Sequence, residues 1–267
     1  MLEALSYDFI QNALIAGLLV SMASGIIGSL IVVNRMVFLA GGIAHTAYGG
    51  IGVAVYFSLP IFLGASIFAV LAALLIASIT LKHRERMDTF IGLMWAVGMA
   101  VGVVLIDITP GYQADFMSYL FGSILAVSQS DLWFMGGLLA VIIIIIIFWY
   151  RDILAVSYDS EYANLRGINV PFFYTLILIL SALTVVVAIK VVGLILVIAL
   201  LTIPVYIAER LSNTLFSMMI LSGIFSSVFT IMGLWFSYEY DISSGASIIL
   251  ISAGSLFLFL GVQRVLK

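Results

Sequence analysis

The feature that most limits how this chain folds is a series of apolar runs, each long enough to cross a lipid bilayer. A transmembrane helix needs about 17–25 predominantly apolar residues. Nine runs reach that length: Ile10–Val33, Phe38–Phe57, Pro60–Leu81, Phe90–Asp107, Asp131–Tyr150, Pro171–Ala188, Val191–Ala208, Thr214–Phe236 and Ser244–Val262. The apolar sequence around Lys190 is a run of about 38 residues. We divide it into two spans at Lys190, because one helix of that length would be roughly 57 Å long, nearly twice the thickness of the hydrocarbon core. We therefore expect an all-α polytopic membrane protein of about nine transmembrane helices, forming a single transmembrane domain over residues 1–267.

The composition excludes a soluble fold and several kinds of chemistry. Hydrophobic residues make up 64% of the chain and charged residues 9%, whereas a soluble domain carries about 25% charged residues. Cysteine is absent, which excludes disulfides and thiolate metal sites. The GxxxxGK(S/T), HExxH and GxSxG patterns are also absent, so we expect neither ATP hydrolysis nor a hydrolase site in this chain. It is predicted not to be an enzyme, and to have no permanently bound cofactor and no nucleic-acid partner.

The basic residues predict which loops face the cytoplasm. If the first span starts outside, nine of the ten Lys and Arg residues fall on one side and only Lys190 falls on the other. Because cytoplasmic loops carry an excess of Lys and Arg, we expect the N-terminus outside and the C-terminus on the cytoplasmic side. The outer side carries mostly acidic residues. Two interpretations remain open: an acidic vestibule that concentrates cations, or simply the absence of the basic residues that the rule keeps inside.

His45 is the first candidate functional residue. It lies in the middle of the second apolar run, far from any charged residue. An ionisable group at membrane depth is costly and tends to face a bundle interior or a wet cavity, so it is a functional candidate by default. The alternative is a packed, hydrogen-bonded histidine without a role in transport. Small residues let helices approach closely in lipid, and a proline breaks helical hydrogen bonding, often beside a cavity. On these grounds we expect four residues to pack helices beside a pathway through the membrane: Gly41, Gly42, Gly49 and Pro204.

Two loops are long enough to have a role of their own. The outer one, residues 108–130, is half apolar and is predicted to form a short helix that lies on or re-enters the bundle. The inner one, residues 151–170, contains the signals of a capped helix of about two turns. Asp159 suits the N-cap, Glu161 the first turn, Arg166 the last turn and Gly167 the left-handed position after it. Ala163 and Gly167 are four residues apart and would form a small face close to a partner, so this helix is either a connector or a docking surface.

Several blocks of the chain, in order, resemble the membrane-spanning permeases of ABC-type metal-ion importers for zinc, manganese or iron. The blocks are RMVFLAGGIAHTAYGGIGVA, RERMDTFIGLMWAVGMAVGV, YLFGSILAVSQSDL, YDSEYANLRGI, VVGLILVIALLTIPVYIAERL and DISSGASIIL. Together they cover nearly the whole chain. The resemblance implies the ABC importer permease fold, a homodimer of permeases, two separate ATPase subunits and an external solute-binding protein that delivers the metal. It further implies a place in the cytoplasmic (inner) membrane of a prokaryote. It also implies that YDSEYANLRGI is the segment that docks on the ATPase.

The resemblance carries His45 over as a candidate metal ligand in the translocation pathway. Relatives have an Asp four residues before this His, where the present sequence has Gly41. Residues i and i+4 share a helix face, so the departure removes one ligand from that face. Two protomers would offer two imidazoles, with water or Asp241 completing a site. Imidazole suits zinc, iron and copper better than manganese, but one ligand does not decide the metal.

Other transport functions remain open at this point. The missing Asp favours an ABC permease for a metal chelate or another small solute. An ion-coupled secondary transporter would normally carry internal repeats and intramembrane carboxylates, which the sequence lacks. A membrane scaffold without transport activity is a further alternative. The leading prediction is the transmembrane subunit of an ATP-driven importer of divalent metal ions.

Overall fold

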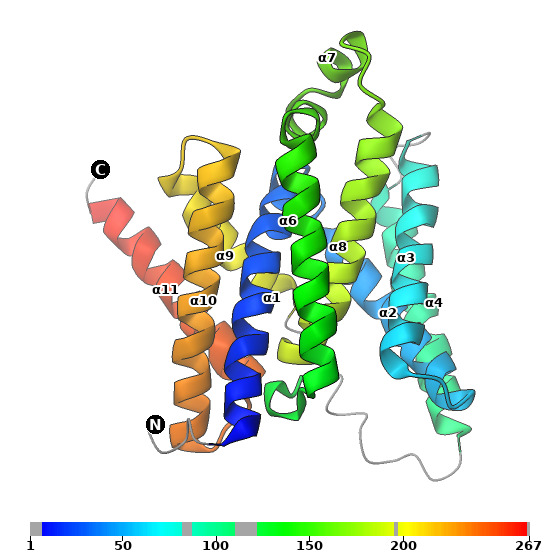
Figure 1. The fold of residues 1–267 in the computed structure, drawn as a ribbon, viewed down its shortest axis with the longest axis vertical. Coiled ribbons are helices and arrows are strands. Elements are labelled where there is room, and N and C mark those ends of the chain that lie inside the picture. The colour runs from blue at the N-terminus through cyan, green and yellow to red at the C-terminus, as the bar shows by residue number, and fades with distance from the viewer. Residues whose placement is uncertain (1–6, 82–86, 110–121, 195–196, 266–267) are drawn as a thin grey trace. The chain divides into compact units, whose positions relative to one another are not determined.

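The structure is a computed structural model that describes residues 7–81, 87–109, 122–194 and 197–265. Within these ranges the regular structure is helical throughout, without strands. The α-helices, labelled in Figure 1, are α1 (Asp8–Val33), α2 (Val37–Tyr56), α3 (Ile61–Thr80), α4 (Met87–Asp107), α6 (Gln129–Tyr158), α7 (Ser160–Leu165), α8 (Val170–Val192), α9 (Val197–Leu211), α10 (Leu215–Tyr240) and α11 (Ser244–Val265). A 3-10 turn, η3 (Ile124–Ala126), lies between α4 and α6 in the chain. Eight of the described helices are long and apolar enough to cross a membrane. The predicted all-α transmembrane fold is confirmed, and eight of the nine predicted spans each overlap one of these eight helices.

The remaining predicted span, Val191–Ala208, overlaps the last two residues of α8 and then α9, whose described helix has only 15 residues. The uncertain division near Lys190 therefore does separate two helices, and α8 ends at Val192. Gly193 follows with φ +87°, in the left-handed region that an L side chain rarely adopts. A glycine in that conformation is the usual way to terminate a helix. Gly193 thus stops the run that the sequence analysis divided three residues earlier, at Lys190.

The helix α6 extends further than the sequence predicts. The predicted span ends at Tyr150, but α6 runs for 30 residues to Tyr158 with one non-helical residue, Trp149, at φ −117° and ψ 20°. The first residues of the predicted inner loop are therefore helical, and only α7 and its flanking turns connect α6 to α8 (Figure 1). Most of the predicted outer-loop helix lies outside the described residues. The described end of that loop forms the 3-10 turn η3, with Ile124 fully buried.

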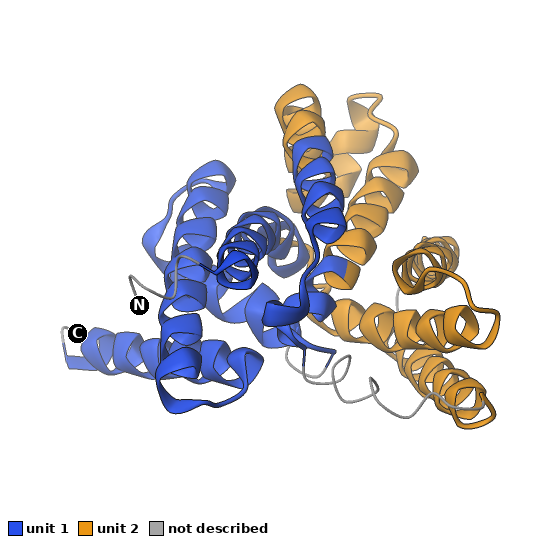
Figure 2. Cartoon of the chain, turned by 60° about the horizontal axis from the view of Figure 1, so that its bottom comes forward, with its two compact units in different colours: residues 1–32, 117–141, 187–267 blue, residues 33–116, 142–186 orange. Residues whose placement is uncertain are grey.

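The chain divides into two compact units, coloured separately in Figure 2. Unit 1 comprises residues 1–32, 117–141 and 187–267, and unit 2 comprises residues 33–116 and 142–186. The helices α6 and α8 each contribute residues to both units. The single transmembrane domain expected over residues 1–267 stays a prediction.

In unit 1, α10 packs against α9 and α11, and its glycine and hydroxyl residues meet those of α1. Gly25 lies directly against the backbone of Gly223, where an added Cβ would be 2.5 Å from the Gly223 Cα. Hydroxyl pairs flank this contact, with Ser21 and Thr230 2.9 Å apart and Ser29 and Ser222 3.1 Å apart. Small residues and interhelical hydrogen bonds are what hold helices together where lipid removes the hydrophobic driving force.

Candidate functional site

The helix α2, which carries His45, is enclosed by its neighbours in unit 2. Most of its residues are buried, and it packs against α3 and α4. The close approach takes place at glycines, whose partners are Ile91 for Gly42, Gly98 for Gly49, Gly102 for Gly52 and, on α3, Gly64 for Gly50. A Cβ on Gly49 would lie 2.9 Å from the carbonyl oxygen of Gly98. These four glycines of α2 therefore pack against helices of the same chain, and these contacts are not free to meet a second copy.

The His45 ring is held in one tautomer by a backbone hydrogen bond. Its Nδ1 lies 2.9 Å from the carbonyl oxygen of Gly41. A carbonyl oxygen only accepts, so Nδ1 carries the proton and donates it, which leaves the lone pair of a neutral imidazole on Nε2. Among the described residues no group hydrogen-bonds Nε2. Metal-binding histidines are usually oriented in this way, with one ring nitrogen donating to a backbone carbonyl or carboxylate.

Trp95 of α4 covers one face of the imidazole. The ring centroids of His45 and Trp95 are 3.9 Å apart and the rings are inclined by 30°, a stacked arrangement. One residue before Trp95, the Met94 carbonyl accepts a hydrogen bond from the Thr46 hydroxyl at 3.3 Å. His45 is 8% exposed. The imidazole is thus nearly enclosed, with one nitrogen and one face already engaged by the chain itself.

The other predicted metal ligand, Asp241, lies in unit 1, whereas His45 lies in unit 2. Asp241 is exposed and ends α10 in the left-handed conformation, with φ +52° and its backbone N–H donating to the Ser237 carbonyl. Across the described ranges, no three His, Cys, Asp or Glu side chains gather closely enough to hold a metal ion. Within one chain, the described residues offer at most a single strong ligand, His45, at membrane depth. The ligand role of Asp241 stays a prediction.

Pro204 is buried inside α9, and the helix continues through it from Val197 to Leu211. The first turn of a helix tolerates proline best, but this proline is at the eighth position of α9, where the carbonyl four residues earlier loses its donor. That carbonyl belongs to Leu200, which is also buried. Whether this region borders the pathway stays a prediction.

The short helix α7 forms where the sequence predicts a capped helix. The Asp159 carboxylate accepts from the backbone N–H of Tyr162 at 2.9 Å, so Asp159 is the N-cap. Glu161 is in the first turn, Arg166 is the C-cap residue, and Gly167 follows with φ +76°. The Arg166 guanidinium lies 5.8 Å from the centre of the Tyr162 ring. The local signals described the caps of this helix correctly, because capping depends on neighbouring residues alone.

The exposed face of α7 differs from the one that the sequence analysis expected. Ala163 is fully buried, so its methyl group packs inside this protein and does not form a small face for a partner. Leu165 is 88% exposed and Tyr162 51% exposed, and the preceding Tyr158 is 63% exposed. Sequence reasoning passed over these three side chains because a six-residue helix is too short for its apolar period to identify a face. The apolar and aromatic surface at α7, defined by Tyr158 at the end of α6 and by Tyr162 and Leu165 of α7, is the feature that it missed.

Lys190, which departs from the predicted charge asymmetry, has an acidic partner. The Lys190 ammonium lies 3.4 Å from a carboxylate oxygen of Asp131 at the start of α6, and both side chains are partly buried. Both residues belong to unit 1. Lys190 is the one basic residue that departs from the predicted charge asymmetry, and pairing offsets the cost of its charge there.

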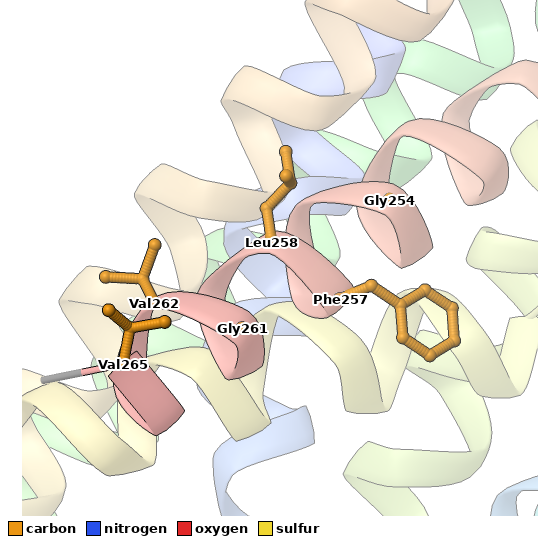
Figure 3. Close-up of a pocket in the computed structure, with 6 residues that line it drawn as sticks. All are labelled: Gly254, Phe257, Leu258, Gly261, Val262 and Val265. Atoms are coloured by element: carbon orange, nitrogen blue, oxygen red, sulfur yellow. The ribbon is translucent and has the colours of Figure 1, made fainter. Parts of the chain in front are cut away.

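An apolar hollow runs along α11 and is unsuited to ion binding. Figure 3 shows the residues that line it: Gly254, Phe257, Leu258, Gly261, Val262 and Val265. None of them carries a polar or charged side chain. Gly254 and Gly261 have open space beside them. Such a surface on an apolar helix suits contact with lipid tails or another apolar helix.

Comparison with known proteins agrees with this architecture. The sequence profile of the ABC 3 transport family matches residues 6–263. The chain is 47% identical to the "Uncharacterized membrane protein slr2045" of Synechocystis sp., over 99% of this chain and 94% of that protein. It is 36% identical to the "Manganese transport system membrane protein MntC" of Halalkalibacterium halodurans, over 96% of this chain and 87% of that protein. The solved structure of PsaBC from Streptococcus pneumoniae in complex with Fab is similar, with a TM-score of 0.86 and 32% identity over 95% of this chain and 91% of that one. With eight described helices able to cross a membrane and a family match over nearly its whole length, the chain belongs to the ABC 3 transport family.

Proposed function

We propose that this protein is the transmembrane subunit of an ATP-driven importer of divalent metal ions, with manganese as the first candidate and zinc and iron as the others. Relatives named as manganese transport membrane proteins support the metal class, at 36% identity over 96% of this chain. The permease has no nucleotide-binding motif of its own. Hydrolysis of ATP therefore belongs to separate ATPase subunits, and an external solute-binding protein delivers the ion.

The observation that carries the proposal is the state of His45. It lies on a buried transmembrane helix with its Nδ1 directed at the Gly41 carbonyl, so that a neutral ring has its lone pair on Nε2. A neutral imidazole binds divalent transition metals through that lone pair. A transport site must also release its ion, and a site with few ligands does so readily. His45 thus serves as a transient ligand on the route. Two copies of the permease in a homodimer supply two imidazoles, and water or Asp241 supplies the remaining ligands.

Coupling to ATP hydrolysis uses α7. Its exposed surface of Tyr158, Tyr162 and Leu165 docks into a cleft of the ATPase, with Glu161 and Arg166 as contacts at the rim. Aromatic side chains and Arg are the residues that most often carry binding energy in protein interfaces. Asp159 and Gly167 fix the two ends of the helix, so movement of the ATPase passes to α6 and α8 through a rigid element. Docking on the ATPase requires α7 to face the cytoplasm, and the N-terminus then lies on the outer side of the cytoplasmic membrane.

A second candidate substrate is a metal chelate or another small solute. The observation that favours it is Gly41, which contributes only a backbone carbonyl to His45 and no carboxylate. A complexed metal arrives with its own ligands and needs fewer from the protein. Uptake of the free ion against that of a chelate, measured with the same preparation, separates the two substrates.

The experiment that tests the proposal compares three variants of His45. The permease is reconstituted in proteoliposomes with its ATPase and binding protein, and manganese uptake is measured. His45→Ala removes both ring nitrogens, whereas His45→Asn keeps an amide donor near the position of Nδ1 and removes the ligand at Nε2. His45→Gln places an amide near the position of Nε2.

Loss of uptake in the Ala and Asn variants with partial uptake in the Gln variant supports a ligand role. Uptake equal to the parent in the Asn variant assigns His45 to packing through Gly41, and the metal route then lies elsewhere. Membrane insertion and assembly with the ATPase are measured for each variant, so that a loss of uptake is not a loss of protein.

A further inference from the structure

The His45 imidazole is held in two independent ways. The hydrogen bond from Nδ1 to the Gly41 carbonyl, 2.9 Å long, fixes the direction of one ring edge. The Trp95 indole, stacked with its centroid 3.9 Å from the imidazole centroid, fixes the plane of the ring. Rotation of the imidazole about its bond to Cβ would break both interactions. The direction of the Nε2 lone pair is thus set by a residue of α4 as well as by α2.

Trp95 is itself fixed in place by the contacts on either side of it. The Thr46 hydroxyl donates to the carbonyl of Met94, the preceding residue. Three residues after Trp95, Gly98 lies so close to α2 that an added Cβ would be 2.6 Å from the Thr46 Cα and 2.9 Å from the His45 carbonyl oxygen. The register of α4 against α2 is therefore locked at the level of the stack. This register places the backbone of Trp95 beside His45, where the indole stacks on the imidazole.

We infer that Trp95 is a positioning residue for the transported metal: by stacking on His45 it holds the Nε2 lone pair in the direction of the passing cation. This inference rests on the proposed function, in which Nε2 binds a divalent ion. Histidine ligands in metal sites are normally oriented by a hydrogen bond from the other ring nitrogen, and losing that partner costs about 10- to 100-fold in affinity. Here the partner is a backbone carbonyl, which fixes one direction only, and the aromatic stack supplies the second constraint.

The expected size of the effect follows from the strength of aromatic pairs. An aromatic pair contributes enough beyond its buried area to change an equilibrium about two- to tenfold. Removing the indole should therefore raise the KM for manganese roughly two- to tenfold. The maximal rate should change little, because coupling to the ATPase does not pass through this ring.

The transport test uses three variants in the reconstituted complex. Trp95→Leu removes the aromatic ring, and Trp95→Phe keeps a ring that can stack. Trp133→Leu is the matched control, because Trp133 is 76% exposed on α6. We expect a raised KM in Trp95→Leu, a KM near the parent value in Trp95→Phe, and the parent value in Trp133→Leu. Equal KM values in Trp95→Leu and Trp133→Leu would overturn the inference.

A second measurement keeps both residues intact and so does not depend on how Trp95→Leu folds. The chain has four tryptophans, and replacing Trp133, Trp149 and Trp235 with Phe leaves Trp95 as the only indole. Paramagnetic Mn²⁺ bound at Nε2 would lie within a few ångströms of this indole and quench its fluorescence. We expect saturable quenching by added Mn²⁺ that disappears when His45→Ala is introduced in the same background. Absence of quenching, or quenching that survives His45→Ala, contradicts the inference.

Failure of the inference and failure of the proposed function give different results. If His45→Ala abolishes uptake while Trp95→Leu leaves KM unchanged, His45 is a ligand that does not need the stack, and only the role of Trp95 is wrong. If His45→Ala transports manganese like the parent, the route does not use His45, and the roles of both His45 and Trp95 are wrong while manganese import stands. If the parent complex transports no divalent ion, the proposed function itself is wrong.

Discussion

Replacement of Gly98 by alanine is the sharpest test of how α2 and α4 pack beside His45. An alanine methyl at this position would lie 2.6 Å from the Thr46 Cα, 2.9 Å from the His45 carbonyl oxygen and 3.1 Å from the Thr46 N. All three atoms belong to the backbone, so no side chain can rotate out of the way. An ordinary van der Waals contact begins near 3.4 Å. The two helices must therefore move apart by the better part of an ångström.

The loss of stability caused by Gly98→Ala can be compared with a control substitution on the same helix. Gly92 has no atom within 4 Å of the position that a Cβ would take. Both substitutions gain about 1 kcal/mol of helix propensity, since glycine is the less favourable residue within a helix. Overpacking at Gly98 costs about 1–3 kcal/mol, and Gly92→Ala lacks this cost. A difference of 1 kcal/mol shifts Tm by about 2–4 °C in a protein of 150–250 residues, so Gly98→Ala should melt roughly 2–12 °C below Gly92→Ala.

Thermal unfolding of the purified permease in detergent micelles measures this difference, with both variants scanned at the same rate. Separation of the helices also lifts Trp95 away from His45, so Gly98→Ala should raise the KM for manganese as Trp95→Leu does, whereas Gly92→Ala should not. Equal melting temperatures for Gly98→Ala and Gly92→Ala would show that α2 and α4 are not in close contact here. The packing described here around His45 would then be wrong.

Two further predictions concern the cytoplasmic face and the topology. Leu165→Asp should weaken association with the ATPase by about tenfold or more, because it places a charge in the exposed surface at α7. Stimulated ATP hydrolysis measures the loss, and Leu211→Asp is the control at another exposed leucine. Equal hydrolysis in the two variants would show that α7 has no part in coupling. The chain has no cysteine, so single cysteines can report the topology. An impermeant thiol reagent should label Asn164→Cys only from the cytoplasmic side and Ser243→Cys only from the outside, since both positions are exposed. Labelling of Asn164→Cys from the outside would contradict the proposed orientation.

The sequence by itself determined the class of fold and the family resemblance. Runs of about 20 apolar residues have one stable arrangement in a bilayer, which is a helix that satisfies its own backbone hydrogen bonds. The position of each helix therefore followed from hydropathy, and only α6 extended well past its predicted end at Tyr150. The caps of α7 at Asp159 and Gly167 were also predictable, since they depend on residues within a few positions of one another.

Which residue faces which neighbour was decided only by the tertiary structure. The glycines of α2 and the lone His45 stand out in the sequence, but nothing in it pairs Gly49 with Gly98, or His45 with Trp95, because each pair is separated by about 50 residues. Ala163 looked free to meet a partner until its burial showed that it packs within the chain. Contacts of this kind depend on how two helices are rotated and how closely they approach. Hydropathy is nearly uniform around these helices, so it carries no information about rotation, and the packing of small side chains alone selects the faces that meet.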